Sequence, residues 1–383
     1  MNYLIATAMT IGLISLSAHG DLVLPQFRTN IEIHRVFGPE HPGPYKHPAS
    51  ITQLENGDLY IAYYGGEFEY SDETAVYGSR RQKRELMERL GGNQPGTGTL
   101  RSLDIMDTWS PPEAIAATPF RGVGNPVVWQ APDGLVWLFY NNQYGPTWSH
   151  AVVKAKISED GAHTWSDSFI IADEKGSMVR GQPIVLNDGD YLLPLYHETG
   201  ADRQHVGDDT ASYFLRYNPE TREWTETNRI KSPTGNLQAQ VVQTTDNDLF
   251  CFLRRGGGYE PTEEGWMLRA ASNDGGHTWS DAEPTEFPNP NSAVELIKLH
   301  NGNLLLVYND NMNDRTPLAV AVSTDNGETW PHKRIIAGGD NTHAYPYAIQ
   351  GDNDKIYLIY TTNSRTTIMM AVFEEAAIIA YGE

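Results

Sequence analysis

One pattern recurs six times along the chain and constrains its fold more than any other feature. Each copy has alternating apolar residues, a turn that contains Asn, Asp or Gly, and a second apolar run. The two-residue alternation and turn pairs such as Asn56-Gly57 and Asp133-Gly134 predict β-hairpins. The copies span residues 47–66, 125–142, 182–198, 238–255, 292–310 and 345–362.

The spacing of these hairpins predicts how they assemble. Successive turns lie roughly 50 to 60 residues apart, apart from a longer first interval, and a strand-only repeat of this length is typical of propeller blades. Further strands follow the hairpins, for example at residues 319–323 and 367–373. We therefore expect an all-β chain folded as a six-bladed β-propeller. The N-terminal segment 30–36 would lie beside the last strands, 356–360 and 368–373, and complete the last blade.

The strands and turns follow one another so closely that we expect a single domain. An apolar stretch at residues 4–16, followed by small residues, predicts a secretory signal peptide over residues 1–20. Residues 21–383 would form the propeller domain, with residues 82–103 inserted between blades one and two. No later segment reaches the ~18 apolar residues of a membrane-spanning helix. We expect a secreted or periplasmic monomer without a membrane span.

The composition excludes several classes of function. The chain carries 28 Lys and Arg against 49 Asp and Glu, a net charge of −21, so we expect no nucleic-acid partner. Its one cysteine, Cys251, forms no intramolecular disulfide. The histidines do not have zinc-site spacing, and no phosphate-binding loop or dinucleotide motif is present, so we expect neither a metal nor a cofactor. Twenty Tyr and nine Trp suit a cleft that stacks on sugars.

Three segments share a Ser-x-Asp turn that ends in Trp. They span residues 158–165, 272–279 and 323–330, and each follows the third strand of a predicted blade. These segments resemble Asp-boxes, the repeat of bacterial sialidases and their relatives, and the resemblance covers roughly residues 45–373. It implies a sialidase-like propeller with three Asp-boxes. Because such turns lie on the blade edge away from the chemistry, they indicate fold and not function.

The candidate site follows from the propeller geometry. The innermost strands of all blades begin at one mouth of the central channel, so the residues that start each hairpin should converge there. Those residues are His47, Asn125, Gln182, Gln238, Ser292 and Tyr345.

The resemblance to sialidases implies roles for several residues. A sialidase binds the carboxylate of its substrate with three arginines, protonates the leaving oxygen with an Asp, and attacks with a Tyr whose proton passes to a Glu. Tyr345 matches the nucleophile, Arg315 the third arginine and Arg254, more loosely, the second. Three positions depart from the pattern. Lys46 falls at the first arginine, Gln238 or Gln240 at the glutamate, and Asp72 and Glu73 at the acid.

Basic residues lie at the ends of the predicted inner strands of an otherwise acidic chain. Arginine binds a carboxylate through two parallel hydrogen bonds, so the natural ligand is a sugar acid, either a sialic acid or a uronic acid. We predict that Tyr345 reacts and that His47 with Asp72 or Glu73 transfers protons. The predicted substrate-binding residues are Lys46, Asn125, Arg180, Gln182, Gln238, Arg254, Arg315 and Arg365.

Three functions fit this pocket. The first is an exo-acting glycosidase that releases a terminal acidic sugar from a glycan. The second is a uronate polysaccharide lyase, in which His47 removes the proton next to the substrate carboxylate while Arg neutralises that group. The third is a glycan-binding propeller without catalysis. The lyase alone would leave an unsaturated uronate that absorbs ultraviolet light, and the binding protein would turn over nothing.

Overall fold

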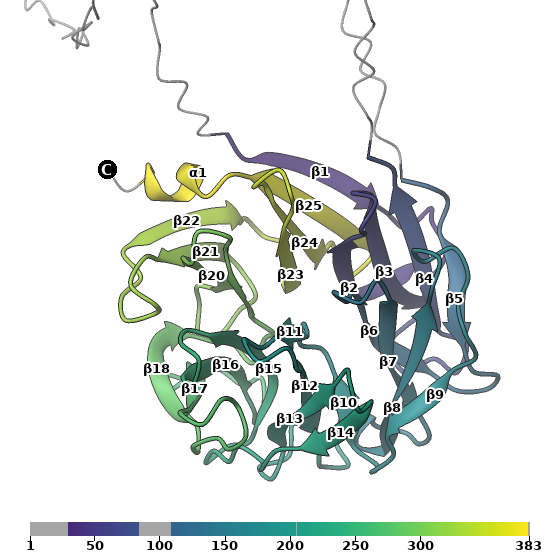
Figure 1. Cartoon of the computed structure of the whole chain (residues 1–383), viewed down its shortest axis with the longest axis horizontal. Coiled ribbons are helices and arrows are strands. Elements are labelled where there is room, and N and C mark those ends of the chain that lie inside the picture. The colour runs from purple at the N-terminus through teal and green to yellow at the C-terminus, as the bar shows by residue number, and fades with distance from the viewer. Residues whose placement is uncertain (1–29, 84–108, 204, 382–383) are drawn as a thin grey trace, which may run out of the picture.

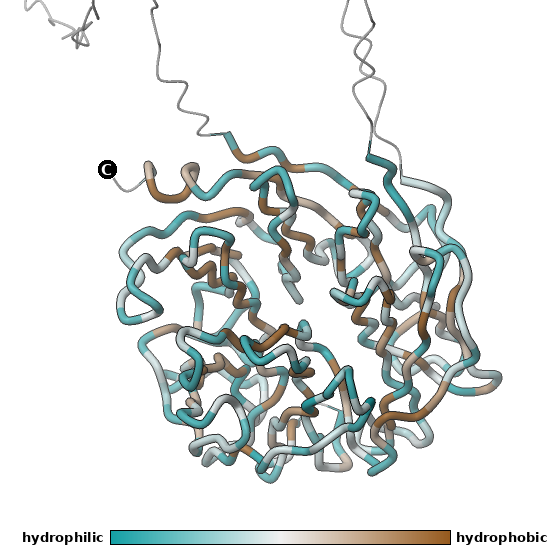
Figure 2. Tube along the Cα trace, viewed as in Figure 1, coloured by the Kyte–Doolittle hydropathy of each residue, from teal (hydrophilic) through white to brown (hydrophobic). Residues whose placement is uncertain are grey.

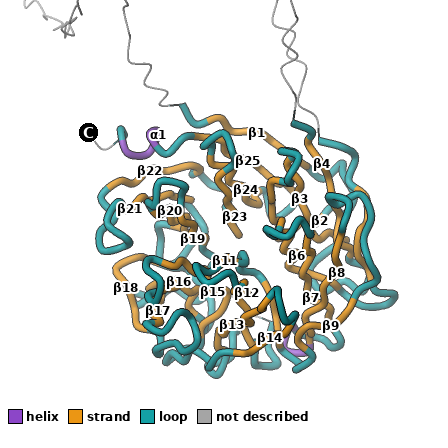
Figure 3. Tube along the Cα trace, in the orientation of Figure 1, coloured by secondary structure: helices purple, strands orange, loops and turns teal. Residues whose placement is uncertain are grey.

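The computed structural model describes residues 30–83, 109–203 and 205–381. The predicted signal peptide and most of the predicted 82–103 insertion lie outside these residues. Figure 1 looks along the shortest axis of the molecule and shows six sheets arranged around a centre. The prediction of an all-β, six-bladed propeller is confirmed, and Figure 3 shows strands and loops almost throughout.

Each blade is an antiparallel sheet whose first strand lies innermost. Blade one contains β2 (Tyr45–Gln53), β3 (Leu59–Gly66), β4 (Ala75–Arg81) and β5 (Glu113–Ala117). Blade two contains β6 (Val123–Gln130), β7 (Val136–Gln143), β8 (Ala151–Ser158) and β9 (Phe169–Ala172). Blade three contains β10 (Ser177–Val179), β11 (Ile184–Val185), β12 (Tyr191–His197), β13 (Ala211–Asn218) and β14 (Glu223–Glu226).

The remaining three blades continue the same order. Blade four contains β15 (Asn236–Gln243), β16 (Leu249–Arg255), β17 (Trp266–Ser272) and β18 (Glu283–Pro288). Blade five contains β19 (Glu295–Lys298), β20 (Leu304–Asn309), β21 (Leu318–Ser323) and β22 (His332–Ala337). Blade six contains β23 (Ala344–Gln350), β24 (Ile356–Thr362), β25 (Thr367–Phe373) and, on its outer edge, β1 (Glu32–Phe37).

The ring closes between the two ends of the chain. Strand β1 pairs antiparallel with β25, with Glu32 opposite Val372 and Phe37 opposite Ile368. This pairing confirms the prediction that the N-terminal segment completes the last blade. In the described part of the chain, two short helical segments accompany the strands, a 3-10 turn at Trp148–His150 and α1 at Ala376–Ile379. Among the described residues, no helix is long and apolar enough to cross a membrane.

The core lies between neighbouring sheets, because the middle strands are covered on both faces. Every residue of β20 and β24 is buried, and their sequences are accordingly apolar with little alternation. The outer strand β14, in contrast, has no buried residue. Figure 2 shows the same gradient, with hydrophobic segments inside the ring and hydrophilic turns at its edge.

A glutamine at the end of the first strand joins several blades to the blade before them. Its side-chain oxygen accepts a hydrogen bond from a main-chain N–H in the turn of the preceding blade. The pairs are Gln130 with Glu55 (3.3 Å), Gln243 with Asn187 (2.8 Å), Gln350 with His300 (2.7 Å) and Gln53 with Asp352 (2.8 Å). The last pair joins blade one to blade six, so it reinforces the closure of the ring.

The three Ser-x-Asp turns share one set of hydrogen bonds. In the first, Asp160 accepts bonds from the main-chain N–H and the hydroxyl of Thr164, at 2.8 and 2.6 Å, and these bonds lower the pKa of Asp160. Asp274 and Asp325 accept the same pair of bonds from Thr278 and Thr329. The three carboxylates accept hydrogen bonds from residues of their own turns, so they stabilise the edge of each blade.

The tryptophan of the second turn packs between blades. The ring of Trp279 stacks on Phe214 of blade three at 4.4 Å between ring centres, and only 6% of Trp279 is exposed. Its main-chain N–H donates to the side chain of Asn228, also in the preceding blade, at 2.8 Å.

We predict that Trp279→Ala lowers the free energy of unfolding by about 3–5 kcal/mol, because it leaves a cavity between two sheets. Denaturant unfolding followed by circular dichroism measures the change. Phe120→Ala is the control, since Phe120 is 85% exposed and its truncation should cost less than about 0.5 kcal/mol. A loss below about 1 kcal/mol for Trp279→Ala would show that this ring does not hold the blades together.

Candidate active site

A repeated irregularity in the first strands directs polar side chains into the channel mouth. The pairing of first and second strands shifts register between Lys46 and Ala49, and shifts again at the equivalent place in blades two, four and six. Within three of these bulges, Asn125, Gln238 and Tyr345 have positive φ angles of 45°, 58° and 53°. Left-handed backbone is costly for residues such as Gln and Tyr, and it is typical of functional sites.

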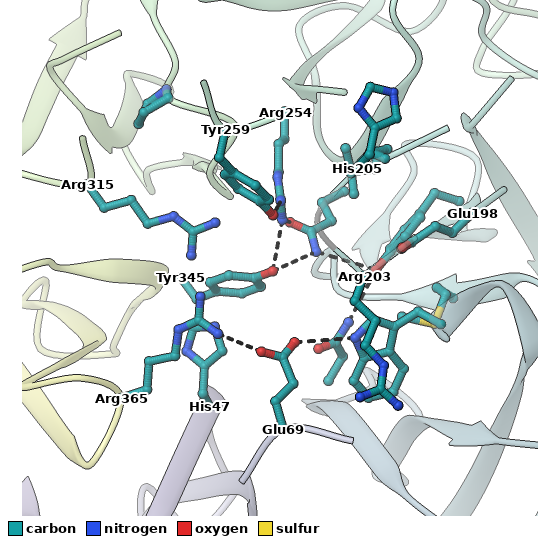
Figure 4. A pocket seen from close by; sticks show the side chains of 18 of the residues that line it. His47, Glu69, Glu198, Arg203, His205, Arg254, Tyr259, Arg315, Tyr345 and Arg365 are labelled. Carbon is teal, nitrogen blue, oxygen red and sulfur yellow. Dashed lines mark hydrogen bonds and ion pairs between the residues drawn. The ribbon is translucent and has the colours of Figure 1, made fainter. Parts of the chain in front are cut away.

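A cavity of about 340 Å³ opens at this mouth. It is lined by seven of the residues predicted from sequence, namely His47, Asn125, Gln238, Arg254, Arg315, Tyr345 and Arg365. Figure 4 shows Tyr345 near the middle of this group, with the three arginines around it. The structure therefore brings together the predicted nucleophile position and three guanidinium groups from blades four, five and six.

The hydroxyl of Tyr345 is held by two donors. Arg254 Nη1 donates to it at 2.8 Å and Gln238 Nε2 at 3.3 Å. Arg254 also donates to Gln238 Oε1 at 3.1 Å, which fixes the amide with its NH₂ group toward the phenol. Gln238 is therefore a hydrogen-bond donor to Tyr345, and it occupies the place where the resemblance to sialidases expected a proton acceptor.

The charges around Tyr345 favour its ionised form. Burial alone would raise the pKa of the phenol, but the positive charges of Arg254 and Arg315 outweigh burial and lower the pKa below 10. The central carbon of the Arg315 guanidinium lies 5.7 Å from the centre of the Tyr345 ring. A phenol with a lowered pKa is a better nucleophile at neutral pH, and here it gains that property without a neighbouring carboxylate base.

Arg315 has unused hydrogen-bonding capacity. Its Nη2 donates to the main-chain oxygen of Asn291 at 3.0 Å, whereas its Nη1 is buried and has no partner among the described residues. Only 9% of Arg315 is exposed. A buried guanidinium nitrogen without an acceptor costs free energy that an anion in the cavity would recover.

Arg365, the last of these three residues along the chain, belongs to blade six. Arg365 lies in the turn between β24 and β25, where Asn363, Ser364 and Arg365 all have left-handed backbone with φ angles of 51°, 53° and 64°. Its Nη1 donates to Glu69 Oε2 at 2.6 Å and to the hydroxyl of Tyr45 at 2.9 Å. Three successive residues in this costly conformation indicate that the surrounding structure holds the turn in place.

Lys46, which falls at the position of the first arginine, lies outside the cavity. Side chains alternate along a strand, so when His47 faces the channel Lys46 faces the other way. Its ammonium group donates to the main-chain oxygens of His41 and Gly43, and burial lowers its pKa to about 8. The main-chain N–H of Lys46 donates to the oxygen of Arg365 at 2.7 Å, so Arg365 lies beside the strand from which the family arginine was expected.

His47 lies edge-on to the Tyr345 ring, with 4.1 Å between the ring centres. The hydroxyl of Thr361 donates to the oxygen of Ala344, so His47 Nδ1 donates to Thr361 at 2.8 Å and Nε2 keeps its lone pair. Burial and the neighbouring arginines hold the pKa of His47 well below 6.5. The imidazole is therefore neutral at physiological pH.

Four other predicted residues do not line the cavity. Asp72 and Glu73 are exposed in the loop after β3, whose backbone turns at Tyr70 (φ 66°) so that Glu69 faces the cavity instead. Gln182 lies in the irregular segment between β10 and β11, and together with Gln130 it lines a separate cavity. Arg180 is fully buried, with the central carbon of its guanidinium 5.6 Å from the centre of the Tyr345 ring, and it donates to the main-chain oxygen of Pro346.

Comparison with known proteins assigns the family. A model of the BNR repeat-like domain matches residues 57–358. The chain belongs to this family. Over 160 residues it is 26% identical to the anhydrosialidase of the leech Macrobdella decora, an alignment that covers 39% of this chain and 19% of that protein. The chain therefore matches only about a fifth of that relative's length.

Solved structures share the fold of this BNR repeat-like propeller. The Hadza microbial sialidase Hz136 superimposes with a TM-score of 0.70 at 18% identity, over 90% of this chain and 69% of that one. The leech intramolecular trans-sialidase has a TM-score of 0.67 at 13% identity, covering 91% and 71%. A Dyadobacter fermentans protein of unknown function has a TM-score of 0.66 at 17% identity, covering 89% and 99%.

Sequence reasoning missed several cavity residues of the BNR repeat-like propeller. Glu69, Trp148, Arg203 and Tyr259 all line the cavity from loops that join strands. No motif marks these residues. Glu69 differs from the nearby Asp72 and Glu73 only because the course of its loop points its side chain into the cavity. Glu198 directly follows β12, and only the fold shows that it lines the cavity.

We predict that Arg254→Gln raises the pKa of Tyr345, since the amide removes the positive charge that favours the phenolate. Ultraviolet absorbance against pH, taken as the difference between each protein and its Tyr345→Phe counterpart, isolates this phenol. Arg269→Gln is the control, because Arg269 is exposed on β17 and packs on Phe250. An unchanged titration in Arg254→Gln would show that Arg254 does not set the pKa.

Proposed function

We propose that this protein is an exported glycosidase that releases a terminal acidic sugar, of the sialic acid or uronic acid type, from glycans. The observation that carries the proposal is the set of three guanidinium groups, those of Arg254, Arg315 and Arg365, that line one cavity with Tyr345. Export rests on the sequence of residues 1–20 and stays a prediction.

The arginines support an acidic ligand. In a chain with a net charge of −21, three guanidinium groups at one cavity form a local site of opposite sign. Arginine matches the planar geometry of a carboxylate, and Arg315 holds a buried nitrogen that lacks an acceptor. A carboxylate bound there would neutralise charges that the protein itself leaves only partly compensated.

Tyr345 supports glycoside cleavage. The negative charge of a carboxylate nucleophile would be repelled by the carboxylate of an acidic sugar, whereas a phenol approaches as a neutral or partly ionised group. Arg254 and Gln238 hold the phenolic oxygen, so its direction of attack is fixed. The sialidases among the structural relatives share the fold, and they support the choice of reaction class by analogy.

One observation favours a second function. The amide of Gln238 contacts Tyr345 where a sialidase would carry a glutamate, and an amide cannot take the tyrosine proton. A propeller that binds acidic glycans without cleaving them would tolerate this difference. Turnover by the wild-type protein separates the two functions.

We expect the mature protein to cleave fluorogenic glycosides of sialic or glucuronic acid, and Tyr345→Phe to lower kcat by about 100-fold or more. The variant keeps the ring and removes only the hydroxyl. Fluorescence follows hydrolysis, and ultraviolet absorbance detects an unsaturated product if the enzyme is a lyase. A variant that keeps more than about a third of the wild-type kcat would contradict the nucleophilic role of Tyr345.

We predict that Arg315→Ala lowers kcat/KM on an acidic glycoside by at least ~10-fold, since each charged hydrogen bond to a desolvated carboxylate contributes roughly 1.5–3 kcal/mol. The thermal midpoint of the variant checks that the fold is retained. Turnover of a neutral glycoside, if any, should be the same in both proteins. Equal kcat/KM values on the acidic glycoside would exclude Arg315 from carboxylate binding.

A further inference from the structure

Four carboxylates line the cavity in the described part of the chain. Asp202 and Asp314 are exposed at its rim, whereas Glu69 and Glu198 are partly buried. Glycoside cleavage by a phenolate needs a second group that gives a proton to the leaving oxygen. Asp72 and Glu73 are exposed and lie outside the cavity. Glu69 and Glu198 are therefore the candidates for the proton donor.

Three donors from the surrounding residues hold the carboxylate of Glu69. Its Oε2 accepts hydrogen bonds from Arg365 at 2.6 Å and from the hydroxyl of Tyr45 at 3.0 Å, and its Oε1 accepts one from the indole of Trp148 at 3.3 Å. Both oxygens of Glu69 are therefore occupied by donors, and the carboxylate orients Arg365 and Trp148.

Glu198 has the opposite environment. Its main-chain N–H donates to Gly176 at 2.8 Å, but its carboxyl group has no hydrogen-bond partner among the described residues. One buried apolar cluster supplies much of the cavity wall on this side, through Trp148, Met178, Tyr196, Val206 and Leu237. An unpaired carboxyl group beside an apolar wall favours its neutral, protonated form.

We propose that Glu198 is the catalytic acid that protonates the leaving oxygen, and that Glu69 has only a positioning role. This inference rests on the proposed glycosidase function. Figure 4 shows Glu198 on the side of the cavity away from Arg315 and Arg365, so a sugar whose carboxylate binds the arginines extends toward it.

The reaction balances with the residues in the cavity. The phenolate oxygen of Tyr345 forms a bond to the anomeric carbon while the bond from that carbon to the leaving oxygen breaks, and the proton of Glu198 passes to the leaving oxygen. In the second step the Glu198 carboxylate removes a proton from water. The water oxygen then bonds to the anomeric carbon, the phenolate leaves, and both residues return to their starting forms.

The pKa of Glu198 agrees with this role. Burial raises it to about 7, Arg254 opposes that shift and the negative charge of Glu69 adds to it. The other titratable or charged groups on this part of the wall are Tyr70, Tyr196, Asp202, Arg203 and His205. A carboxylic acid that titrates near neutral pH is protonated in a large fraction of molecules and can also act as a base after it gives its proton.

The test compares two leaving groups on the same acidic sugar. An alkyl glycoside needs a proton on its leaving oxygen, whereas a nitrophenyl glycoside does not. We expect Glu198→Gln to lower kcat/KM about 100-fold or more on the alkyl glycoside and less than about 10-fold on the nitrophenyl glycoside. The surface variant Glu263→Gln makes the same chemical change at an exposed glutamate outside the cavity and should alter neither value.

The pH dependence gives a second measurement that needs only the wild-type protein. The ratio of kcat/KM for the alkyl glycoside to that for the nitrophenyl glycoside cancels the ionisation of Tyr345 and reports the protonated fraction of Glu198. We expect this ratio to be constant below pH 7 and to fall as the pH rises through about 7. In Glu198→Gln the ratio should not change with pH.

The outcomes distinguish this role from the proposed function. If the wild-type protein cleaves acidic glycosides but Glu198→Gln loses activity equally on both leaving groups, Glu198 is not the acid and the glycosidase function stands. If Glu69→Gln shows the leaving-group dependence instead, the assignment is reversed. Absence of turnover by the wild-type protein on every acidic glycoside would overturn both proposals together.

Discussion

The pairing of β1 with β25 is the constraint on which the rest of the molecule depends. A ring of sheets buries the faces of its first and last blades only if the ring closes, and here an N-terminal strand completes the sheet built by the C-terminal strands. The hydrogen bond from the main-chain N–H of Asp352 to Gln53 then joins blade six to blade one. Closure also brings His47 to Thr361, which lies 314 positions later in the chain, and so creates the site.

The site concentrates positive charge in a protein that is otherwise acidic. Arg254 is 3% exposed and Arg315 9%, so both guanidinium groups lose most of their hydration. Polar groups compensate Arg254, which binds Asn291, Tyr259, Gln238 and Tyr345. The field of these charges lowers the pKa of Tyr345, whereas burial raises the pKa values of Tyr196 and Tyr347 nearby. One arrangement therefore places positive charge in the cavity and favours the ionised form of the Tyr345 phenol.

The two walls of the cavity give similar side chains different properties. Glu69 accepts hydrogen bonds from a guanidinium, a phenol and the indole of Trp148, whereas the carboxyl group of Glu198 has no such partner among the described residues. Burial without a partner raises the pKa of Glu198, and the donors around Glu69 fix the direction of its side chain. Environment also sets the properties of Tyr345, because the charge of Arg254 helps to lower its pKa while the amide of Gln238 contacts its hydroxyl.

Local patterns in the sequence were sufficient to predict the blades and much of the site. Alternation of apolar residues and turns such as Asn56-Gly57 specify hairpins through short-range geometry, and their repetition specifies the ring. His47 and Tyr345 were predicted because they begin strands that a propeller must bring to one mouth, whereas Arg254 and Arg315 were assigned through the resemblance to sialidases. Only the tertiary structure decided the remaining positions. Whether Lys46 or Arg365 faces the cavity, and whether Glu69 or Asp72 does, depends on bulges and left-handed turns. Such turns form when neighbouring blades pack, and no local residue pattern specifies them.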